Sequence, residues 1–168
     1  SSPQIITNTS SRTVSGSTIS YNVPSGKFVQ LNSSCALNPL GAVDNTITVD
    51  GTLNCQGFVL GSSESGTFVL GASGTILTAN TNGLGTVSSS SGSVQVTTGI
   101  TFPATATYIY NGTTAQVTGN GLPAAFTTGT LIINNTAAGT AGVSLSRTTT
   151  FNDGATLIDS MGRIILNN

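Results

Sequence analysis

A strict alternation of apolar and polar residues runs through residues 46–56, and it restricts what this chain can fold into more than any other feature. The even positions are polar, and the odd positions are apolar or small: Ile47, Val49, Gly51, Leu53 and Cys55. A period of two is typical of a half-buried β-strand. The phrase Phe-Val-Leu-Gly then occurs at residues 58–61 and again at 68–71, and Phe-Val-Gln-Leu occurs at 28–31. This spacing by multiples of ten predicts short strands stacked in register.

Short strands with one apolar face favour a β-solenoid, because a single strand cannot bury that face and stacked neighbours can. Glycines fall between the apolar phrases, where a turning chain needs backbone angles that a Cβ disfavours: Gly57, Gly61, Gly66, Gly71 and Gly74. We therefore predict one β-solenoid domain over residues 12–168. Residues 1–11 form a polar lead, either a tail or a strand that pairs outside its own first coil. An antiparallel β-sandwich, which also uses short strands and glycine-rich turns, is the alternative.

The second half of the chain continues the pattern with other residues. In the segment TATYIY, Ala106, Tyr108 and Tyr110 fall on one side. Further short apolar strands are predicted at residues 94–96, 131–133, 143–145 and 164–166. The serine-rich residues 88–93 are predicted to form a loop, with a stacked serine ladder as the alternative. No helical period is sustained, so we expect essentially no α-helix beyond one turn near residues 123–126.

The chain carries very little charge, with four basic and five acidic residues among 168 and no His. Such a balance lacks the basic patch by which proteins bind nucleic acids or anionic membranes. No run approaches the roughly 18 apolar residues of a membrane span, so we predict neither a nucleic-acid partner nor membrane insertion. There is no initiator Met and no signal segment, and we interpret the chain as a processed protein or an excised fragment. A surface of Ser, Thr and Asn with few charges favours self-association.

Cys35 and Cys55 follow similar phrases and lie twenty residues apart. If one coil takes about twenty residues, the two cysteines occupy adjacent rungs roughly 4.8 Å apart, within the range that a disulfide requires. A disulfide would suit an exported protein. The alternative is a pair of buried, unbonded thiols. Two cysteines without any His leave a zinc ligand set incomplete.

Catalytic residues, cofactor-binding residues and a metal site are not predicted. The acidic residues are few: Asp44, Asp50, Glu64, Asp153 and Asp159. No His is present to act as a general base, and no Gly-Lys phosphate-binding motif occurs. Asp44 and Asp50 could hold a weak Ca²⁺ with Asn45, but a solvated turn is the simpler interpretation. We therefore predict that the protein is not an enzyme.

The phrases ITVDGTLNCQGFVLG, GTFVLGASGTILTANTNGL, TYIYNGTTAQVTGNGLPA and TLIINNTAAGTAGVSLS resemble the β-helical repeat regions of large secreted surface proteins of Bacteroidetes, which are adhesin-like or autotransporter-like. The resemblance extends over residues 43–145. It implies a right-handed parallel β-helix, export from the cell, and a structural or adhesive role. Asp159-Ser160-Met161 also resembles the O-glycosylation signal of that group, which makes Ser160 a candidate glycosylation site. This chain is shorter than the proteins it resembles, so it is either a fragment of a giant adhesin or a self-contained subunit.

We expect an extracellular structural protein, the subunit of an end-to-end stacked filament or surface stalk with an adhesive role. The last predicted strand has no evident cap, and uncapped β-helix ends favour stacking of one subunit on another. The candidate self-association residues are Ile5, Ile6, Ile164, Ile165 and Leu166. Two alternatives remain. The outward Thr46, Thr48 and Thr52 could bind a repetitive ligand such as a glycan or ice, or the chain could be a spacer module excised from a larger adhesin.

Overall fold

The computed structural model of this chain describes residues 4–6, 20–36, 45–139, 141–160 and 162–165. All regular structure among these residues is β-strand and none is α-helix, which confirms the predicted all-β class. The helical turn expected near residues 123–126 is wrong, because Ala125 and Phe126 form a strand. No helix in the described part of the chain is long and apolar enough to cross a membrane.

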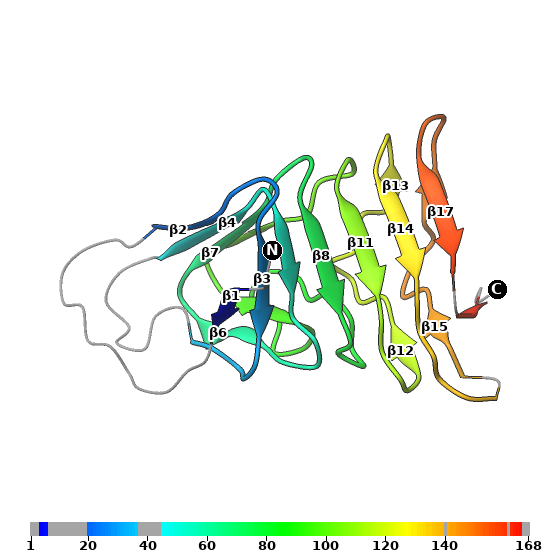
Figure 1. The fold of residues 1–168 in the computed structure, drawn as a ribbon, viewed down its shortest axis with the longest axis horizontal. Helices are drawn as coiled ribbons and strands as arrows, with labels where there is room; N and C mark the ends of the chain where they lie inside the picture. The colour runs from blue at the N-terminus through cyan, green and yellow to red at the C-terminus, as the bar shows by residue number, and fades with distance from the viewer. Residues whose placement is uncertain (1–3, 7–19, 37–44, 140, 161, 166–168) are drawn as a thin grey trace.

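One parallel sheet extends along the whole molecule, and its strands lie side by side along the long axis (Figure 1). The order of this seven-stranded sheet is β1 (Gln4–Ile6), β3 (Phe28–Leu31), β5 (Thr52–Asn54), β8 (Thr75–Thr78), β11 (Thr107–Tyr110), β14 (Thr130–Ile133) and β17 (Thr156–Asp159). Its spatial order is also its sequence order. Each step along the axis therefore adds one segment of chain, which we call a repeat.

Four shorter sheets form the other sides. The four-stranded sheet has the order β10 (Gly99–Thr101), β7 (Thr67–Leu70), β4 (Thr46–Val49) and β2 (Ser20–Val23), and the three-stranded sheet has the order β12 (Gln116–Val117), β15 (Val143–Ser144) and β18 (Ile164–Ile165). Two pairs complete the set: β6 (Leu60–Glu64) with β9 (Val94–Val96), and β13 (Ala125–Phe126) with β16 (Thr150–Phe151).

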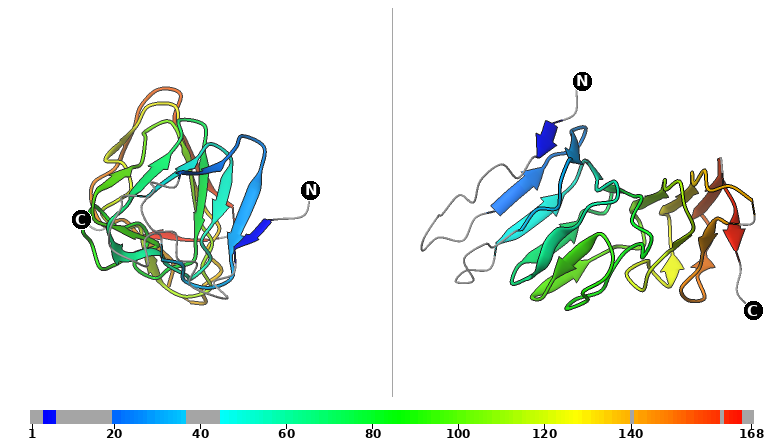
Figure 2. Two further views of the ribbon diagram at one scale, coloured as in Figure 1. Left: turned by 90° about the vertical axis from the view of Figure 1, so that its left-hand side faces the viewer. Right: turned by 90° about the horizontal axis from the view of Figure 1, so that it is seen from below.

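Every strand pairing in the described part of the chain is parallel. Viewed along the long axis, the strands surround a common interior (Figure 2). The antiparallel sandwich is therefore wrong.

The strand register sets the length of each repeat. Thr52 pairs with Thr75, and the step from Thr107 to its partner Thr130 has the same length. The step from Thr130 to Thr156 is slightly longer, and the step from Thr75 to Thr107 is the longest of the four. All four exceed the coil of about twenty residues that the sequence suggested, so that expectation is too short.

The ten-residue echo of Phe-Val-Leu-Gly does not mark stacked strands. Phe68 lies in β7 and pairs with Ile47 of β4, whereas Leu60 of the first phrase pairs with Val94 in a different sheet. The two phrases thus occupy consecutive sides of the molecule within one repeat, between β5 and β8. Their similarity reflects the common need for an apolar strand followed by a turn.

The alternation at residues 46–56 is confirmed. Its odd positions are buried and its even positions are partly exposed. β4 ends at Val49 and β5 begins at Thr52, so one alternation serves two sheets that meet at a corner. A Cβ on Gly51 at this corner would overlap the carbonyl oxygens of Pro24 and Lys27, which explains the glycine.

Aromatic side chains form a row through the interior. Ala106, Tyr108 and Tyr110, which were predicted to share one side of a strand, are all fully buried. The Tyr108 ring meets the Phe126 ring edge-on with centroids 5.5 Å apart, and Phe126 stacks on Phe151 of the next repeat at 5.0 Å. Such contacts link consecutive repeats through the core.

The repeat between β8 and β11 is longer because residues 79–93 form an additional loop, hereafter the inserted loop. The Ser93 N–H donates to the Gly83 carbonyl at 2.8 Å, and the Leu84 N–H donates to the Thr118 carbonyl at 3.0 Å. The inserted loop therefore lies between β9 and β12, which belong to different sheets. It contains the serine-rich segment, which is a loop as predicted.

Candidate functional site

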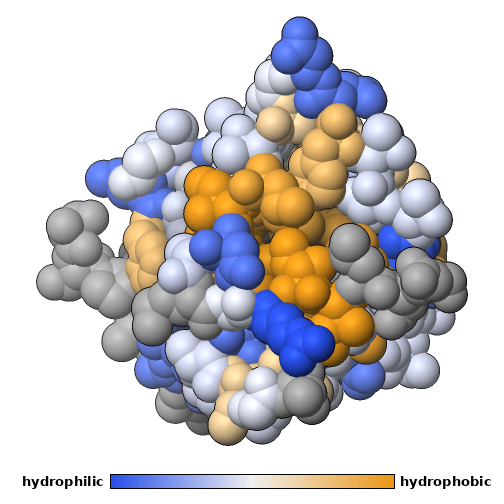
Figure 3. Space-filling model, turned by 90° about the vertical axis from the view of Figure 1, so that its right-hand side faces the viewer, coloured by the Kyte–Doolittle hydropathy of each residue, from blue (hydrophilic) through white to orange (hydrophobic). Residues whose placement is uncertain are grey.

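The C-terminal end of the molecule exposes apolar side chains that earlier repeats bury. Leu157 continues the inward row of the seven-stranded sheet and pairs with Leu131. Leu131 is fully buried, whereas Leu157 is 47% exposed, because no described strand follows β17. Phe151 and Ile164 pack against the core but are only partly buried. Figure 3 looks at this end and shows hydrophobic surface gathered at its centre. We call Phe151, Leu157 and Ile164 the end surface.

Three strand edges surround the end surface. β16, β17 and β18 are each the last strand of their sheets, so one side of each strand has no strand partner in the described part of the chain. Of the predicted self-association residues, Ile164 and Ile165 form β18 and are half-buried. Leu166 lies outside the described residues. Open edges of this kind offer N–H and C=O groups to another strand.

The N-terminal end also has open edges, formed by β1 and β2. Ile5 and Ile6, for which we considered pairing outside the first coil, instead pair in parallel with β3 of the same chain, opposite Gln30 and Leu31. Within a single chain that expectation is wrong. Tyr21 in β2 is 47% exposed, although its register partner Ile47 is buried.

Asp159 interrupts the apolar character of the C-terminal end. It pairs with Ile133, which in turn pairs with Tyr110, and both of those residues are fully buried. Asp159 itself is exposed, and its Oδ1 accepts a hydrogen bond from the Gly162 N–H at 3.0 Å. A carboxylate thus occupies an inward position at the open edge, a device that proteins use to discourage edge-to-edge association.

The outer face of the seven-stranded sheet carries two columns of side chains in register. The first column contains threonines: Thr52, Thr75, Thr107, Thr130 and Thr156. The second is aliphatic and lies two residues further along each strand: Leu77, Ile109, Ile132 and Ile158. Neighbouring members of a column are about 4.8 Å apart, the spacing between parallel strands. We call this surface the threonine face.

The structure separates the three threonines that were predicted to point outward. Thr46 and Thr48 lie in β4 of the four-stranded sheet, where they are partly exposed. Only Thr52 belongs to the threonine face. Sequence reasoning missed the rest of both columns because their members are far apart in the chain and unevenly spaced, as the steps from Thr52 to Thr75 and from Thr75 to Thr107 show.

Cys35 and Cys55 are buried and both are free thiols in the structure. The backbone of Cys35 pairs with that of Leu60 in an isolated parallel β-bridge. The Cys55 N–H donates to the Leu77 carbonyl at 2.9 Å. Their neighbours in the next repeat are therefore other residues, so the adjacent-rung premise of the disulfide is wrong. Burial raises the pKa of both thiols, for Cys55 to about 12.

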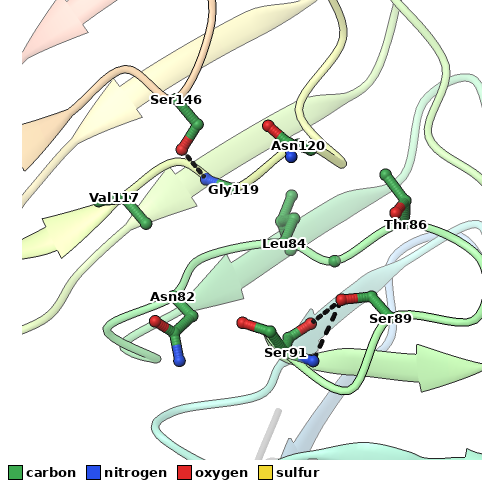
Figure 4. A pocket seen from close by; sticks show the side chains of 10 residues that line it. Asn82, Leu84, Thr86, Ser89, Ser91, Val117, Gly119, Asn120 and Ser146 are labelled. Atoms are coloured by element: carbon green, nitrogen blue, oxygen red, sulfur yellow. Dashed lines mark hydrogen bonds between the residues drawn. The ribbon is translucent and has the colours of Figure 1, made fainter.

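A polar pocket of about 210 Å³ lies beside the inserted loop. Its lining comes from that loop and from the two following repeats: Asn82, Leu84, Gly85, Thr86, Ser89, Ser91, Val117, Gly119, Asn120 and Ser146. Figure 4 shows the polar side chains arranged around Leu84. The Ser91 N–H donates to Ser89 Oγ at 3.1 Å, and the Gly119 N–H donates to Ser146 Oγ at 2.8 Å.

Close backbone contacts build this pocket. Gly119 has φ +73° and Gly83 has φ +63°, values that favour glycine. A Cβ on Gly119 would overlap the Leu84 carbonyl oxygen, and one on Gly83 would overlap that of Thr118. The cluster of glycines in the inserted loop and near residue 120 was a usable sequence signal for this site, although no pocket was predicted from it.

The remaining predicted positions lie apart from these surfaces. Ser160 is exposed next to β17, so its hydroxyl is accessible, and its glycosylation stays a prediction. Asp44 lies outside the described residues. Among the residues that the structure does describe, no group of three or more His, Cys, Asp or Glu side chains could hold a metal ion.

Comparison with known proteins yields no relative of this chain: no protein-family model, no curated protein and no solved structure matches it.

Proposed function

We propose that this chain is a right-handed parallel β-helix, exported from the cell, which stacks end to end into a filament or surface stalk with an adhesive role. The parallel pairing supports the β-helix. A chain that returns to the same sheet in the same direction, as from Thr52 to Thr75, has to cross the other sides in between. Crossovers between parallel strands are almost always right-handed.

The observation that carries the stacking proposal is the contrast between Leu157 and Leu131. The two leucines occupy the same inward row, yet Leu157 is 47% exposed and Leu131 is buried. A second molecule seated on the end surface would bury this apolar area, at roughly 25 cal/mol per Å². The two ends of the molecule are different surfaces, so the contact is head-to-tail and does not close, which produces a filament.

The test is electron microscopy and sedimentation velocity of the purified chain at increasing concentration. We expect larger assemblies as concentration rises, and filaments of uniform width. Leu157→Asp should abolish them, because it places a charge at the centre of the contact. Val87→Asp is the matched control, since Val87 is 43% exposed in the inserted loop, on the side of the molecule.

Monomers at every concentration would contradict end-to-end stacking and favour a spacer module of a larger protein. Equal loss of assembly in both aspartate variants would also contradict it, because the side surface would then matter as much as the end.

The threonine face favours a second candidate function, the binding of a regular surface such as ice. Hydroxyl groups in register at about 4.8 Å, beside an aliphatic column, can order water at a spacing close to that of ice. Thr107→Lys should abolish thermal hysteresis, whereas Thr48→Lys on another sheet should leave it unchanged. Absence of thermal hysteresis in the unmodified protein would exclude this function.

A further inference from the structure

The pocket beside the inserted loop has the size of a site for one small molecule. Its volume of about 210 Å³ is below the roughly 300–1,000 Å³ typical of sites for drug-sized ligands. It is nevertheless larger than one water molecule, whose share of liquid volume is about 30 Å³. The pocket therefore suits a ligand of one ring rather than an extended chain.

The lining favours a neutral ligand over a charged one. None of the ten lining residues has an ionisable side chain. An ion placed there would lose part of its hydration without gaining a partner of opposite charge. A neutral molecule has no such cost.

The pocket offers hydrogen-bonding groups that the protein itself does not use. The side chains of Asn82, Thr86 and Asn120 are exposed and make no hydrogen bond within the described part of the chain. Ser146 Oγ accepts from the Gly119 N–H, so its own proton remains available to a ligand. Hydroxyls and amides both donate and accept, which matches a ligand that carries several hydroxyl groups.

The same pocket has an apolar part. Leu84 lies at the centre of the lining (Figure 4) but is only 1% exposed, so the apolar surface that a ligand can contact is the methyl-bearing side of Val117, which is 38% exposed. Alternating C–H and hydroxyl surface is the chemical character of a pyranose ring. The glycine contacts described above hold the backbone of the walls in place, so little ordering is needed when a ligand binds.

We propose that this pocket binds a single neutral sugar residue, free or as part of a glycan. The site is separate from the end surface, so sugar binding does not depend on stacking. Each subunit would then have one weak sugar-binding site, and a stack of subunits would bind a multivalent glycan with higher avidity than a single subunit.

Ligand-observed saturation-transfer NMR tests the proposal, because it works for single molecules and large assemblies alike. The probes are the methyl glycosides of glucose, galactose and N-acetylglucosamine, with glucuronic acid and glucose 6-phosphate as charged counterparts. We expect a saturable signal from at least one neutral glycoside and none from the charged sugars. No signal from any neutral glycoside, or equal signals from charged and neutral sugars, would overturn the proposal.

Two variants localise the binding. Asn82→Ala combined with Asn120→Ala should weaken it about tenfold, as expected for the loss of two hydrogen bonds. Asn120→Trp should abolish it by filling the pocket, whichever polar atoms the sugar uses. Asn152→Ala, at an exposed asparagine in the turn before β17, is the matched control. Binding that survives Asn120→Trp would place the sugar elsewhere and overturn the assignment.

Discussion

The two leucines at positions 131 and 157 allow the same substitution to be compared inside the stack and at its open end. They are register partners in neighbouring strands of one sheet, and both occupy the inward row. They differ in burial alone, since Leu131 is fully buried and Leu157 is 47% exposed. Replacing each with Ala therefore measures how far the core extends.

The expected losses of stability differ several-fold. Leu131→Ala removes a buried side chain between two packed repeats and leaves a cavity, which costs about 2–5 kcal/mol in the free energy of unfolding. Leu157→Ala removes a side chain that is about half in water already and leaves no enclosed cavity. Half of the transfer free energy of a leucine is about 1 kcal/mol.

Urea denaturation of both variants at high dilution, followed by circular dichroism, checks these values. The measurement is then repeated at concentrations at which the protein assembles. The loss in the free energy of unfolding caused by Leu157→Ala should rise toward that caused by Leu131→Ala, since a second molecule then covers position 157. Equal losses at dilution would refute the reasoning, because they would mean that Leu157 is already covered within a single chain. A cost for Leu157→Ala that does not depend on concentration would contradict the stacked contact.

Four further predictions concern the interior and the end surface. Tyr110→Phe should lower the free energy of unfolding by about 1 kcal/mol, because it removes the hydrogen bond from the Tyr110 hydroxyl to the Thr118 carbonyl at 2.7 Å while that carbonyl keeps the bond from the Leu84 N–H; an unchanged free energy in urea denaturation would contradict this. Burial raises the pKa of Tyr110 above its usual value and that of Cys55 to about 12. Both groups are neutral at neutral pH, and the stability lost on ionising them should lower the urea midpoint as pH rises from about 9 toward their pKa values in the folded protein. A midpoint that rises over this pH range would refute the burial of these two groups. The Cys55 thiol should also resist a thiol reagent at neutral pH until the protein unfolds. Asp159→Asn keeps the hydrogen bond from Gly162 possible and removes the charge that opposes a second molecule over position 159, so a partner can cover the whole of β17 and self-association measured by sedimentation should strengthen about tenfold; unchanged association would show that the carboxylate does not restrain the contact.

Local pattern was sufficient to predict several strands and the side chains that share a face, but it missed β16 and β17 at the C-terminal end. The odd positions from Ile47 to Cys55 are buried, as are Tyr108 and Tyr110, because a period of two places alternate side chains on one face whatever the sheet contains. The parallel pairing was implied by resemblance to β-helical proteins. Neither result required knowledge of which strands are neighbours.

Register was beyond local pattern, and the wrong predictions of the coil length and of the disulfide share that cause. The pairing of Cys35 with Leu60 follows from a repeat longer than the coil inferred from the sequence, as in the steps from Thr52 to Thr75 and from Thr130 to Thr156. A repeated phrase at ten residues does not report that length, because it compares two sides of one coil. The pocket escaped prediction for the same reason, since it depends on the inserted loop meeting the segment around residue 118.

The end surface has an apolar side chain that favours association, and beside it lies a carboxylate that opposes it. The two together determine how a second molecule can be placed in a stack. Leu157 favours burial, while Asp159, two residues along the same strand, would lose hydration if a second molecule continued the sheet directly over it. A partner that covers Phe151 and the first half of β17 gains the apolar contact and leaves the carboxylate at the rim in water. A partner placed over only part of β17 forms fewer hydrogen bonds with the open strand edges than one that continues the sheet. Assembly should therefore depend on apolar burial more than on strand pairing, and Leu157→Asp should affect it more strongly than any change at the β18 edge.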